Sequence, residues 1–349
     1  MINASGKTIK YALPFGELCS LIPKEPGEVI RLLPLNDRIE GHAATAKVAS
    51  QDVRKVLAGL GFAFPFQTLA FMNLKGGVGK TTSAVTMASR AVQYGFRTCL
   101  LDLDAQASAT LSFGVLPEEG EPIFNDVWEA PAEKVPAAVK DIEGNFSLLP
   151  SALENSLLDV SLMKPAAQKG AVKGVCDALR GLGFDLIIID CPPALGAATI
   201  STVCAVDTVV VPVRSDAFSF RGVELTLAEV GTIRDTFGLE DVEIRILLTM
   251  VDRRQTLTHQ FREKLENKYG RLLLPEIIRT STEYPKALEE KETVFAHSRK
   301  SNAKADFDAV ARKLLGLDSF FRQLRFPPKN EGSGREALSA VGSANGGGL

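Results

Sequence analysis

The chain has 349 residues, of which 45% are apolar and 23% are charged, and its formal net charge is −2. This length is more than one average domain needs, and the balance is that of a globular protein, which excludes wholesale disorder, collagen and a disulfide miniprotein. The five cysteines are widely spaced without a CxxC or Cys/His cluster, so we expect buried thiols of a reducing compartment and no zinc or iron–sulfur site. No apolar stretch approaches the roughly 20 residues of a membrane span, and the first residues lack a signal-peptide pattern. We therefore expect a cytoplasmic protein.

The charge is distributed unevenly along the chain. Residues 71–244 carry 13 basic and 23 acidic side chains, whereas residues 245–330 carry 18 basic and 11 acidic ones. A basic region on a mildly acidic protein is typical of a surface that meets a polyanion, because local charge rather than net charge sets the attraction to phosphates. A solvated helical surface is the alternative, and charge alone favours that alternative.

Residues 1–66 differ from the rest of the chain. They contain short apolar clusters, several prolines and one convincing helical pattern, which covers residues 50–60. Ser50 is placed to cap this helix, and Gly59 and Gly61 are placed to end it. We expect an N-terminal helical extension that serves as part of a helix-turn-helix, as a dimer contact or as a partner-docking segment.

From Gln67 onward, strands alternate with helical stretches. Continuous apolar strands separated by helices predict an α/β domain over residues 67–326, with a mostly parallel sheet covered by helices on both faces. Residues 327–349 are rich in Gly, Ser and Ala and predict a disordered tail. The six predicted strands are Thr68–Met72, Thr98–Asp102, Phe146–Leu149, Leu186–Asp190, Thr208–Val213 and Glu243–Met250.

A glycine-rich loop, Lys75-Gly-Gly-Val-Gly-Lys-Thr-Thr82, lies between the first of these strands and the first helix. Glycines in such a loop let backbone N–H groups surround a polyphosphate, and the helix start adds its positive end. The loop matches the GxxxxGK[ST] pattern except at the opening glycine, which is Leu74 here. In this pattern Lys80 contacts the β- and γ-phosphates, and the Thr81 hydroxyl holds Mg²⁺. The strand–loop–helix setting argues against a chance Gly-rich turn.

Lys75 is a second lysine in a loop that already has Lys80, so its ammonium is free to reach a nucleotide across a dimer interface; a solvated loop residue is the alternative. With this lysine the loop resembles the deviant Walker A signature of the ParA/MinD branch of P-loop ATPases, and the chain is closest to the ParA partition proteins. The resemblance implies a P-loop NTPase fold and two ATP molecules sandwiched between two subunits, with Lys75 on the partner's phosphates. The implied nucleotide-binding residues are Lys75, Gly76, Gly77, Val78, Gly79, Lys80, Thr81 and Thr82.

Two carboxylates follow the second strand. Asp102 and Asp104 are two residues apart, so both can point toward the phosphate end of the sheet. The run resembles the family's D-x-D-P-Q motif, with Ala105 in place of the proline. This resemblance implies that Asp104 positions or activates the attacking water and that Asp102 supports the metal or the loop. Capping of the next helix is the alternative for the pair.

A third carboxylate ends a buried strand. The run 184–193 resembles a Walker B site, which implies that Asp190 takes Mg²⁺ through a water opposite Thr81. Cys191 stands where the family often has Thr, and we interpret it as a small buried substitute rather than a redox or cluster ligand.

Shorter matches continue in order to about residue 315. They fall where ParA proteins have their nucleotide-base loops and basic DNA-facing positions, which implies a contact of Met250 with the nucleotide. The implied DNA-binding residues are Arg254 and Arg279 by motif, and Lys286, Arg299, Lys300 and Lys304 by charge. Such a surface has no base-reading geometry, so we expect salt-sensitive binding to nonspecific DNA.

The resemblance implies an ATPase with ATP and Mg²⁺ as cofactors that hydrolyses ATP to ADP and phosphate, slowly without a partner. It further implies a homodimer on nonspecific nucleoid DNA, a ParB-like adaptor that stimulates hydrolysis, and the segregation of plasmid or chromosome DNA. Positioning of a non-DNA cargo on the nucleoid is one alternative. Another is a MinD-like membrane ATPase anchored by the amphipathic stretch 307–326, and a third is a metabolic ATPase that transfers phosphate to a small acid.

Overall fold

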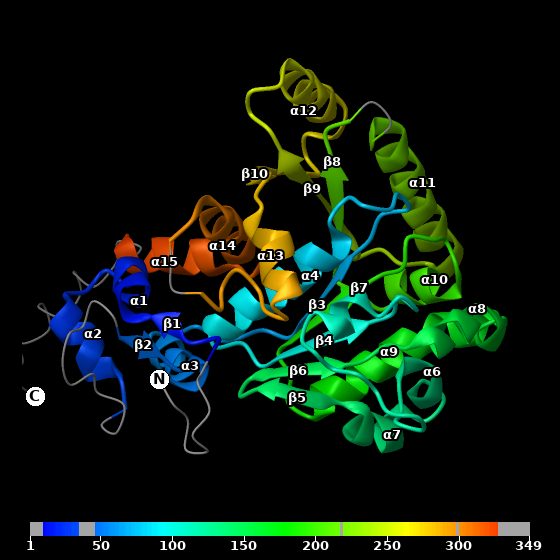
Figure 1. Cartoon of the computed structure of the whole chain (residues 1–349), viewed down its shortest axis with the longest axis horizontal. Coiled ribbons are helices and arrows are strands. Elements are labelled where there is room, and N and C mark those ends of the chain that lie inside the picture. The colour runs from blue at the N-terminus through cyan, green and yellow to red at the C-terminus, as the bar shows by residue number, and fades with distance from the viewer. Residues whose placement is uncertain (1–9, 35–45, 217–218, 298–299, 327–349) are drawn as a thin grey trace, which may run out of the picture.

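The computed structural model describes residues 10–34, 46–216, 219–297 and 300–326 (Figure 1). The predicted disordered tail, residues 327–349, lies outside these ranges. A central sheet runs through the molecule, helices cover both of its faces, and the N-terminal elements pack at one end (Figure 1).

The central sheet has eight strands in the order β10-β9-β8-β3-β7-β4-β6-β5. All neighbouring pairs are parallel except β5 and β6, which confirms the predicted mostly parallel sheet. All six predicted strands are present, whereas β5 and β10 are additions at the two edges. The strands are β3 (Gln67–Phe71), β4 (Thr98–Asp102), β5 (Lys140–Glu143), β6 (Phe146–Leu149), β7 (Leu186–Asp190), β8 (Thr208–Arg214), β9 (Glu243–Val251) and β10 (Leu273–Arg279).

Side chains alternate between the two faces of the sheet, as the two-residue period of a strand requires. Leu69 and Phe71 of β3 join the apolar cluster of α4 and α14, while Ala70 and the following Met72 join that of α9, α10 and α11. Both faces are therefore buried. The helices of this domain are α4 (Lys80–Gln93), α5 (Ser108–Leu111), α6 (Phe124–Val127), α7 (Pro131–Ala138), η2 (Leu153–Leu157), α8 (Leu158–Ser161), α9 (Pro165–Gly181), α10 (Ala197–Val203), α11 (Ser219–Phe237), α12 (Thr256–Tyr269), α13 (Glu283–Glu289), α14 (Asn302–Leu314) and α15 (Leu317–Arg325).

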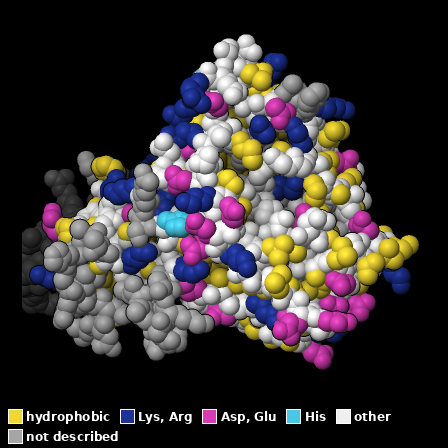
Figure 2. Space-filling model, viewed as in Figure 1, with side chains coloured by type: hydrophobic (Ala, Val, Ile, Leu, Met, Phe, Trp, Pro, Cys, Tyr) yellow, Lys and Arg dark blue, Asp and Glu magenta, His cyan; other side chains and the backbone are white. Residues whose placement is uncertain are grey.

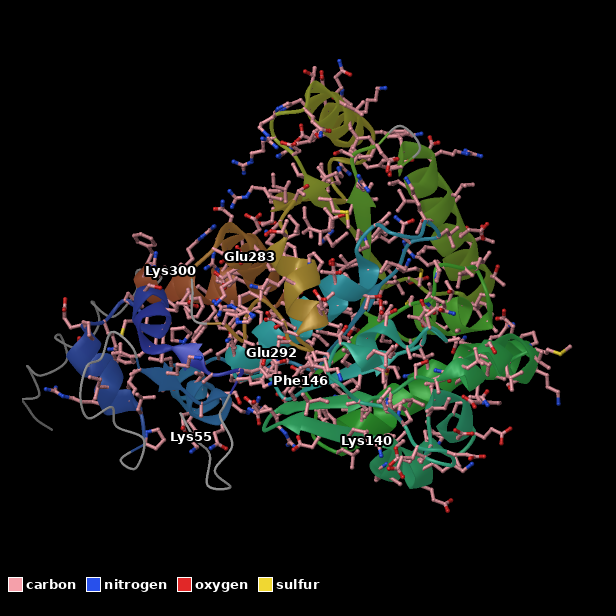
Figure 3. All side chains as sticks on the ribbon, viewed as in Figure 1. Lys55, Lys140, Phe146, Glu283, Glu292 and Lys300 are labelled. Carbon is pink, nitrogen blue, oxygen red and sulfur yellow. The ribbon has the colours of Figure 1, made fainter. Side chains whose placement is uncertain are left out.

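The described part of the N-terminal extension shares the core of the α/β domain. Phe15 and Leu18 are at most 2% exposed and belong to the same apolar cluster as Phe307 of α14. Tyr11 packs edge-on against Phe146, with 5.6 Å between the ring centroids. Figure 3 labels Phe146 at the start of β6. The extension is thus packed onto the sheet domain. Its elements are β1 (Leu13–Pro14), α1 (Phe15–Leu21), α2 (Pro26–Leu32), β2 (Lys47–Val48) and α3 (Ser50–Gly59).

The predicted amphipathic stretch 307–326 is divided between α14 and α15 by Gly316, which has a φ of 72°. Most of its apolar side chains pack against the core: Val310, Leu315 and Leu317 are at most 1% exposed, whereas Phe326 is 76% exposed. The apolar stripe is therefore part of the protein core in this conformation. Within the described ranges, no helix has the length and apolar character needed to span a bilayer.

Candidate phosphate-binding site

The glycine-rich loop joins the middle of the sheet to α4. It follows the carboxyl end of β3, which lies between β7 and β8. Gly77 and Gly79 have φ values of 69° and 90°, in the left-handed region that favours glycine. These turns let α4 begin at Lys80, so the unpaired N–H groups of its first turn face the loop. The loop therefore has the geometry of a polyphosphate cradle.

Lys80 lies inside this loop. It is 7% exposed, and its ammonium donates a hydrogen bond to the carbonyl oxygen of Lys75 at 3.3 Å. Burial lowers the pKa of Lys80, whereas the nearby carboxylates of Asp190 and Asp104 raise it. A buried ammonium surrounded by backbone polar groups is suited to hold an anionic oxygen.

Lys75 is held outside the loop. Its ammonium lies 2.7 Å from both carboxylate oxygens of Asp216 and 3.0 Å from the hydroxyl of Ser219, the first residue of α11. The side chains of Lys75 and Asp216 are each 32% exposed. The same loop therefore presents one lysine to its interior and a second lysine to its outer side.

Asp102 and Asp190 end the neighbouring strands β4 and β7 and are opposite each other in the parallel register. Both are fully buried. Asp102 accepts hydrogen bonds from the Thr110 backbone N–H at 2.8 Å, the Thr110 hydroxyl at 2.7 Å and the Asp104 N–H at 3.1 Å. Burial raises the pKa of Asp102 to about 6 in spite of these bonds. Of the two roles open to Asp102, support of the loop is the one that these contacts favour.

Asp190 has neither carboxylate oxygen hydrogen-bonded within the described part of the chain. Burial and the adjacent Asp102 raise its pKa well above the usual range, and the Thr81 hydroxyl and Lys80 lower it only in part. An orphaned buried carboxylate beside a threonine hydroxyl is a donor set that suits Mg²⁺, which binds one or two carboxylates and keeps several waters. The residues present therefore fit a magnesium ion.

Asp104 and Cys191 follow the same two strands. The Asp104 carboxylate accepts the N–H of Gln106 at 3.0 Å, and its carbonyl oxygen accepts the hydroxyl of Ser151 at 2.7 Å. These bonds hold Asp104 half-buried near Lys80. Cys191 is 1% exposed, and burial raises the pKa of its thiol, so it is an inert thiol in this environment.

A cavity of about 290 Å³ opens beside the phosphate loop. Met250, the penultimate residue of β9, has a φ of 52° and lines this cavity, while its contact with a nucleotide stays a prediction. The Thr249 hydroxyl donates to the carbonyl oxygen of Val78 at 2.8 Å and ties β9 to the loop. Tyr284 and Leu288 of α13 form the opposite wall. These two residues were not predicted as part of the site, because no strand was predicted at β10 and no helix at α13. The apolar run Leu272–Leu274 is the signal that could have indicated the strand.

The cations predicted to face DNA lie in different surroundings. Arg254 and Lys286 have side chains that are 90% and 75% exposed. Arg279 makes a two-pronged contact with Asp306, at 2.9 Å and 2.6 Å, so a phosphate would have to compete with that carboxylate. Arg299 lies outside the described residues.

Lys300 and Lys304 lie apart from Arg254. Lys300 is exposed and Lys304 half-buried, and both line a cavity against the N-terminal extension. In Figure 2, Lys and Arg side chains gather over α12, β10 and the α14–α15 region, whereas Asp and Glu gather around α6–α9. The acidic segment 71–244 and the basic segment 245–330 thus form differently charged regions of the surface.

Comparison with known proteins matches the same part of the chain. A family model described as an AAA domain matches residues 66–246, which include the loop and Asp190. The chromosome-partitioning ATPase Soj of Thermus thermophilus is 30% identical over 247 residues, which cover 71% of this chain and 94% of that protein. The chromosome partitioning protein ParA of Caulobacter vibrioides is 27% identical over 256 residues, covering 73% and 96%.

A solved structure agrees with this match. Cobyrinic acid a,c-diamide synthase from Mycobacterium smegmatis, with a bound ATP analogue and magnesium, is 27% identical and superposes with a TM-score of 0.60. The superposition covers 76% of this chain and 97% of that one. The fold of this chain is therefore similar to that of a protein solved with an ATP analogue and magnesium.

Proposed function

Since this chain belongs to the ParA-type P-loop ATPases, we propose that it is an ATP-driven partition switch. ATP brings two subunits together, the dimer binds DNA without sequence preference, and hydrolysis to ADP and phosphate separates the subunits. The observation that carries this proposal is the pair of lysines in one loop, with Lys80 inside it and Lys75 outside it.

The chemistry is positioning and charge neutralisation. Lys80 and the backbone N–H groups of residues 76–82 bind the β- and γ-phosphates, and Thr81 and Asp190 hold the magnesium ion. Bound magnesium neutralises charge that develops on the phosphate oxygens. Asp104 orients the attacking water at the open side of the loop. A carboxylate such as Asp104 is only a weak base, so hydrolysis is slow until a ParB-like adaptor completes the site.

Lys75 connects the two subunits. Its ion pair with Asp216 is about one-third exposed, and such pairs contribute at most about 1 kcal/mol, so the ammonium can leave Asp216 for a partner's phosphates at little cost. Lys75→Ala is expected to abolish ATP-dependent dimerisation, measured by analytical ultracentrifugation, while ATP binding measured by calorimetry persists. Lys173→Ala, at a 60% exposed lysine of α9, is the matched control. Dimers of normal affinity in Lys75→Ala would overturn the cross-subunit role.

An exposed apolar segment supports self-association. Leu153, Leu157 and Met163 are 70%, 52% and 71% exposed, and apolar side chains gathered on a surface mark interaction sites. The segment is bonded to the phosphate site at two points. The Asn155 amide donates to the Asp102 carbonyl oxygen at 3.5 Å. The Asp159 carboxylate accepts the N–H of Ala197 at 2.6 Å, and Ala197 begins α10 directly after the loop that follows β7. A second subunit packed here would respond to the state of the nucleotide.

The DNA-binding surface is proposed on the basic side of the molecule. The side chains of Arg254 and Lys286 are 90% and 75% exposed, although Arg254 is paired with Asp252 just as Arg279 is paired with Asp306. The decisive test measures binding to nonspecific duplex DNA and to anionic liposomes with ATP, with ADP and without nucleotide, across a salt series. ATP-dependent DNA binding that weakens steeply with salt is expected, and Arg254→Ala with Lys286→Ala should weaken it and reduce the salt slope by about two.

Liposome binding without DNA binding would instead indicate a membrane-positioning ATPase. The burial of Val310, Leu315 and Leu317 argues against that alternative, because these side chains would have to leave the core to reach lipid. Plasmid or chromosome DNA is the proposed cargo. We expect the ATP dimer in the cytoplasm on the nucleoid.

A further inference from the structure

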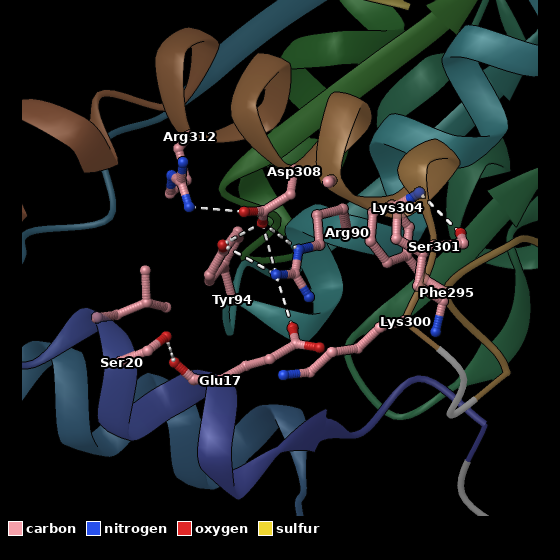
Figure 4. A pocket seen from close by; sticks show the side chains of 12 residues that line it. Glu17, Ser20, Arg90, Tyr94, Phe295, Lys300, Ser301, Lys304, Asp308 and Arg312 are labelled. Carbon is pink, nitrogen blue, oxygen red and sulfur yellow. Dashed lines mark hydrogen bonds and ion pairs between the residues drawn. The ribbon is translucent and has the colours of Figure 1, made fainter. Parts of the chain in front are cut away.

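A second cavity, of about 200 Å³, lies between the N-terminal extension and the α/β domain (Figure 4). It is lined by α1, by Arg90 and Tyr94 at the end of α4, by Phe295 and Lys300, and by α14. Lys80 begins α4 and Tyr94 follows its end, so this cavity is roughly 20 Å from the phosphate loop at 1.5 Å per residue. It is therefore separate from the nucleotide site.

The two carboxylates in this cavity are already neutralised. Arg90 is 3% exposed and donates to Asp308 at 2.7 Å and to Glu17 at 2.9 Å. Arg312 donates to the other oxygen of Asp308 at 2.6 Å. Figure 4 shows these contacts converging on Asp308 from two sides. Arg312 also donates to Asp318 at 2.9 Å, so both guanidinium groups are balanced by carboxylates.

Two further cations in the cavity have no such balance. Over the described ranges, no carboxylate oxygen lies within the 4.0 Å of an ion pair from the ammonium of Lys300 or of Lys304. The Lys304 ammonium donates a hydrogen bond to the carbonyl oxygen of His297. Burial lowers the pKa of Lys304 to about 8, and the nearby Glu17 carboxylate offsets only part of this effect. Both lysines lie on the α14 side of the cavity in Figure 4.

The remaining wall is apolar. Leu21 of α1 and Phe295 are buried, and Ala305 lies on the first turn of α14. The cavity therefore offers, next to a hydrocarbon surface, two ammonium groups that have no ion-pair carboxylate within the described ranges. Its concave shape and volume suit a small molecule with a doubly charged terminal group, whereas the backbone of a duplex presents singly charged diesters on a convex surface.

We propose that this cavity binds a small phosphate monoester, with its dianionic phosphate between Lys300 and Lys304 and its carbon body against Leu21 and Phe295. The proposal goes beyond the partition function and does not depend on it. A ligand here touches both α1 and α14, so it stabilises the contact between the extension and the α/β domain by mass action.

Calorimetric titration of the full-length chain tests the site, with ADP and Mg²⁺ at saturation so that the phosphate loop is filled. Phenyl phosphate is the probe. Inorganic phosphate lacks the phenyl ring and therefore measures what the apolar wall contributes, and phenyl sulfate carries a single charge and therefore measures what the second charge contributes. Phenyl phosphate is expected to bind once per chain, at least tenfold more tightly than phenyl sulfate and severalfold more tightly than inorganic phosphate.

Lys300→Met and Lys304→Met are each expected to weaken phenyl phosphate binding at least tenfold. Lys313→Met, at an exposed lysine of the same helix that lines no part of the cavity, should leave it unchanged. Retained ADP binding shows that each variant is folded. Phenyl phosphate should also slow amide exchange in α1 and at the start of α14.

Three results would overturn the proposal: no binding of phenyl phosphate, equal affinity in the lysine variants, or protection confined to the phosphate loop. Displacement of phenyl phosphate by duplex DNA at equal phosphate concentration would assign these lysines to the DNA surface instead.

Discussion

Asp190 ends β7 with two buried oxygens that lack a hydrogen-bond partner in the described part of the chain. Removing the charge should therefore stabilise the nucleotide-free protein and at the same time remove the response to metal. Asp190→Asn is expected to raise the apo stability by about 1 kcal/mol in thermal unfolding, because a neutral amide costs less to bury than a carboxylate.

The same variant should lose the extra stabilisation that Mg²⁺ adds to ADP in the wild type, about 2.7 kcal/mol at a hundredfold excess over the dissociation constant. Asp141→Asn, at an exposed aspartate of β5, serves as the control and should change neither property. An undiminished magnesium effect in Asp190→Asn would exclude Asp190 as a metal-holding residue.

Asp216 competes with a partner's phosphates for Lys75. If the ion pair of each subunit has to open before dimerisation, Asp216→Asn should lower the dimer dissociation constant in ATP by up to about thirtyfold, since each of the two partly exposed pairs contributes at most about 1 kcal/mol. Sedimentation at several protein concentrations measures this. Asp177→Asn breaks the exposed Lys173–Asp177 pair and should have no effect. Weaker dimers in Asp216→Asn would show that the carboxylate acts within the dimer itself.

The resemblance to the Walker A and Walker B motifs was enough to predict that Lys80, Thr81 and Asp190 lie together, because a strand–loop–helix unit and a parallel neighbour leave few arrangements of their side chains. The contact of Lys75 with Asp216 could not be predicted in this way. It joins residues 141 positions apart, on loops whose relation depends on the strand order. That order follows from the packing of the whole sheet and has no local signal in the sequence.

At the scale of elements, the turn after α4 determines how closely the extension packs. Gly95 has a φ of 87°, and a Cβ there would lie 2.6 Å from the backbone nitrogen of Arg54 on α3. Gly95→Ala should therefore cost at least about 3 kcal/mol, from left-handed strain plus displacement of α3. Gly238→Ala, at a φ of 64° with nothing within 4 Å, should cost only about 1 kcal/mol. Equal losses in urea unfolding would contradict close packing of α3 against this turn.

Strands at the centre of the sheet were predicted more accurately than those at its edges. β4, β6 and β7 have the predicted bounds, since strands buried on both faces are continuous apolar runs. β5, with the sequence Lys-Asp-Ile-Glu, has no such run because it lies at an edge and pairs only with β6.

For α3 the predicted helix is confirmed, but the predicted cap, Ser50, is wrong. The extended residue Ala49 precedes the helix, and the carbonyl oxygen of Ala49 accepts the N–H groups of Asp52 and Val53.

For the whole molecule, the shared core predicts a single unfolding transition. Arg54 of α3 pairs with Asp185, which directly precedes β7. Arg90 of α4 pairs with both Glu17 of α1 and Asp308 of α14, so the extension contacts the α/β domain at several points. Urea unfolding followed by the fluorescence of the single tryptophan should coincide with the loss of amide protection in α1 and α3. An earlier transition in these helices would show that the extension unfolds as a separate unit.

The contact between α1 and α15 also has a consequence for protein synthesis. Arg325 donates to the carbonyl oxygen of Ser20 at 2.8 Å, across 305 residues of sequence. At the usual 5–20 residues per second, α1 waits roughly 15–60 s on the ribosome before α14 and α15 emerge to cover it. During that time Phe15 and Leu18 have no completed core to enter, so the nascent chain presents an apolar N-terminus to chaperones. Slower translation should prolong this exposure, and a chain truncated before α14 should aggregate through its first helix.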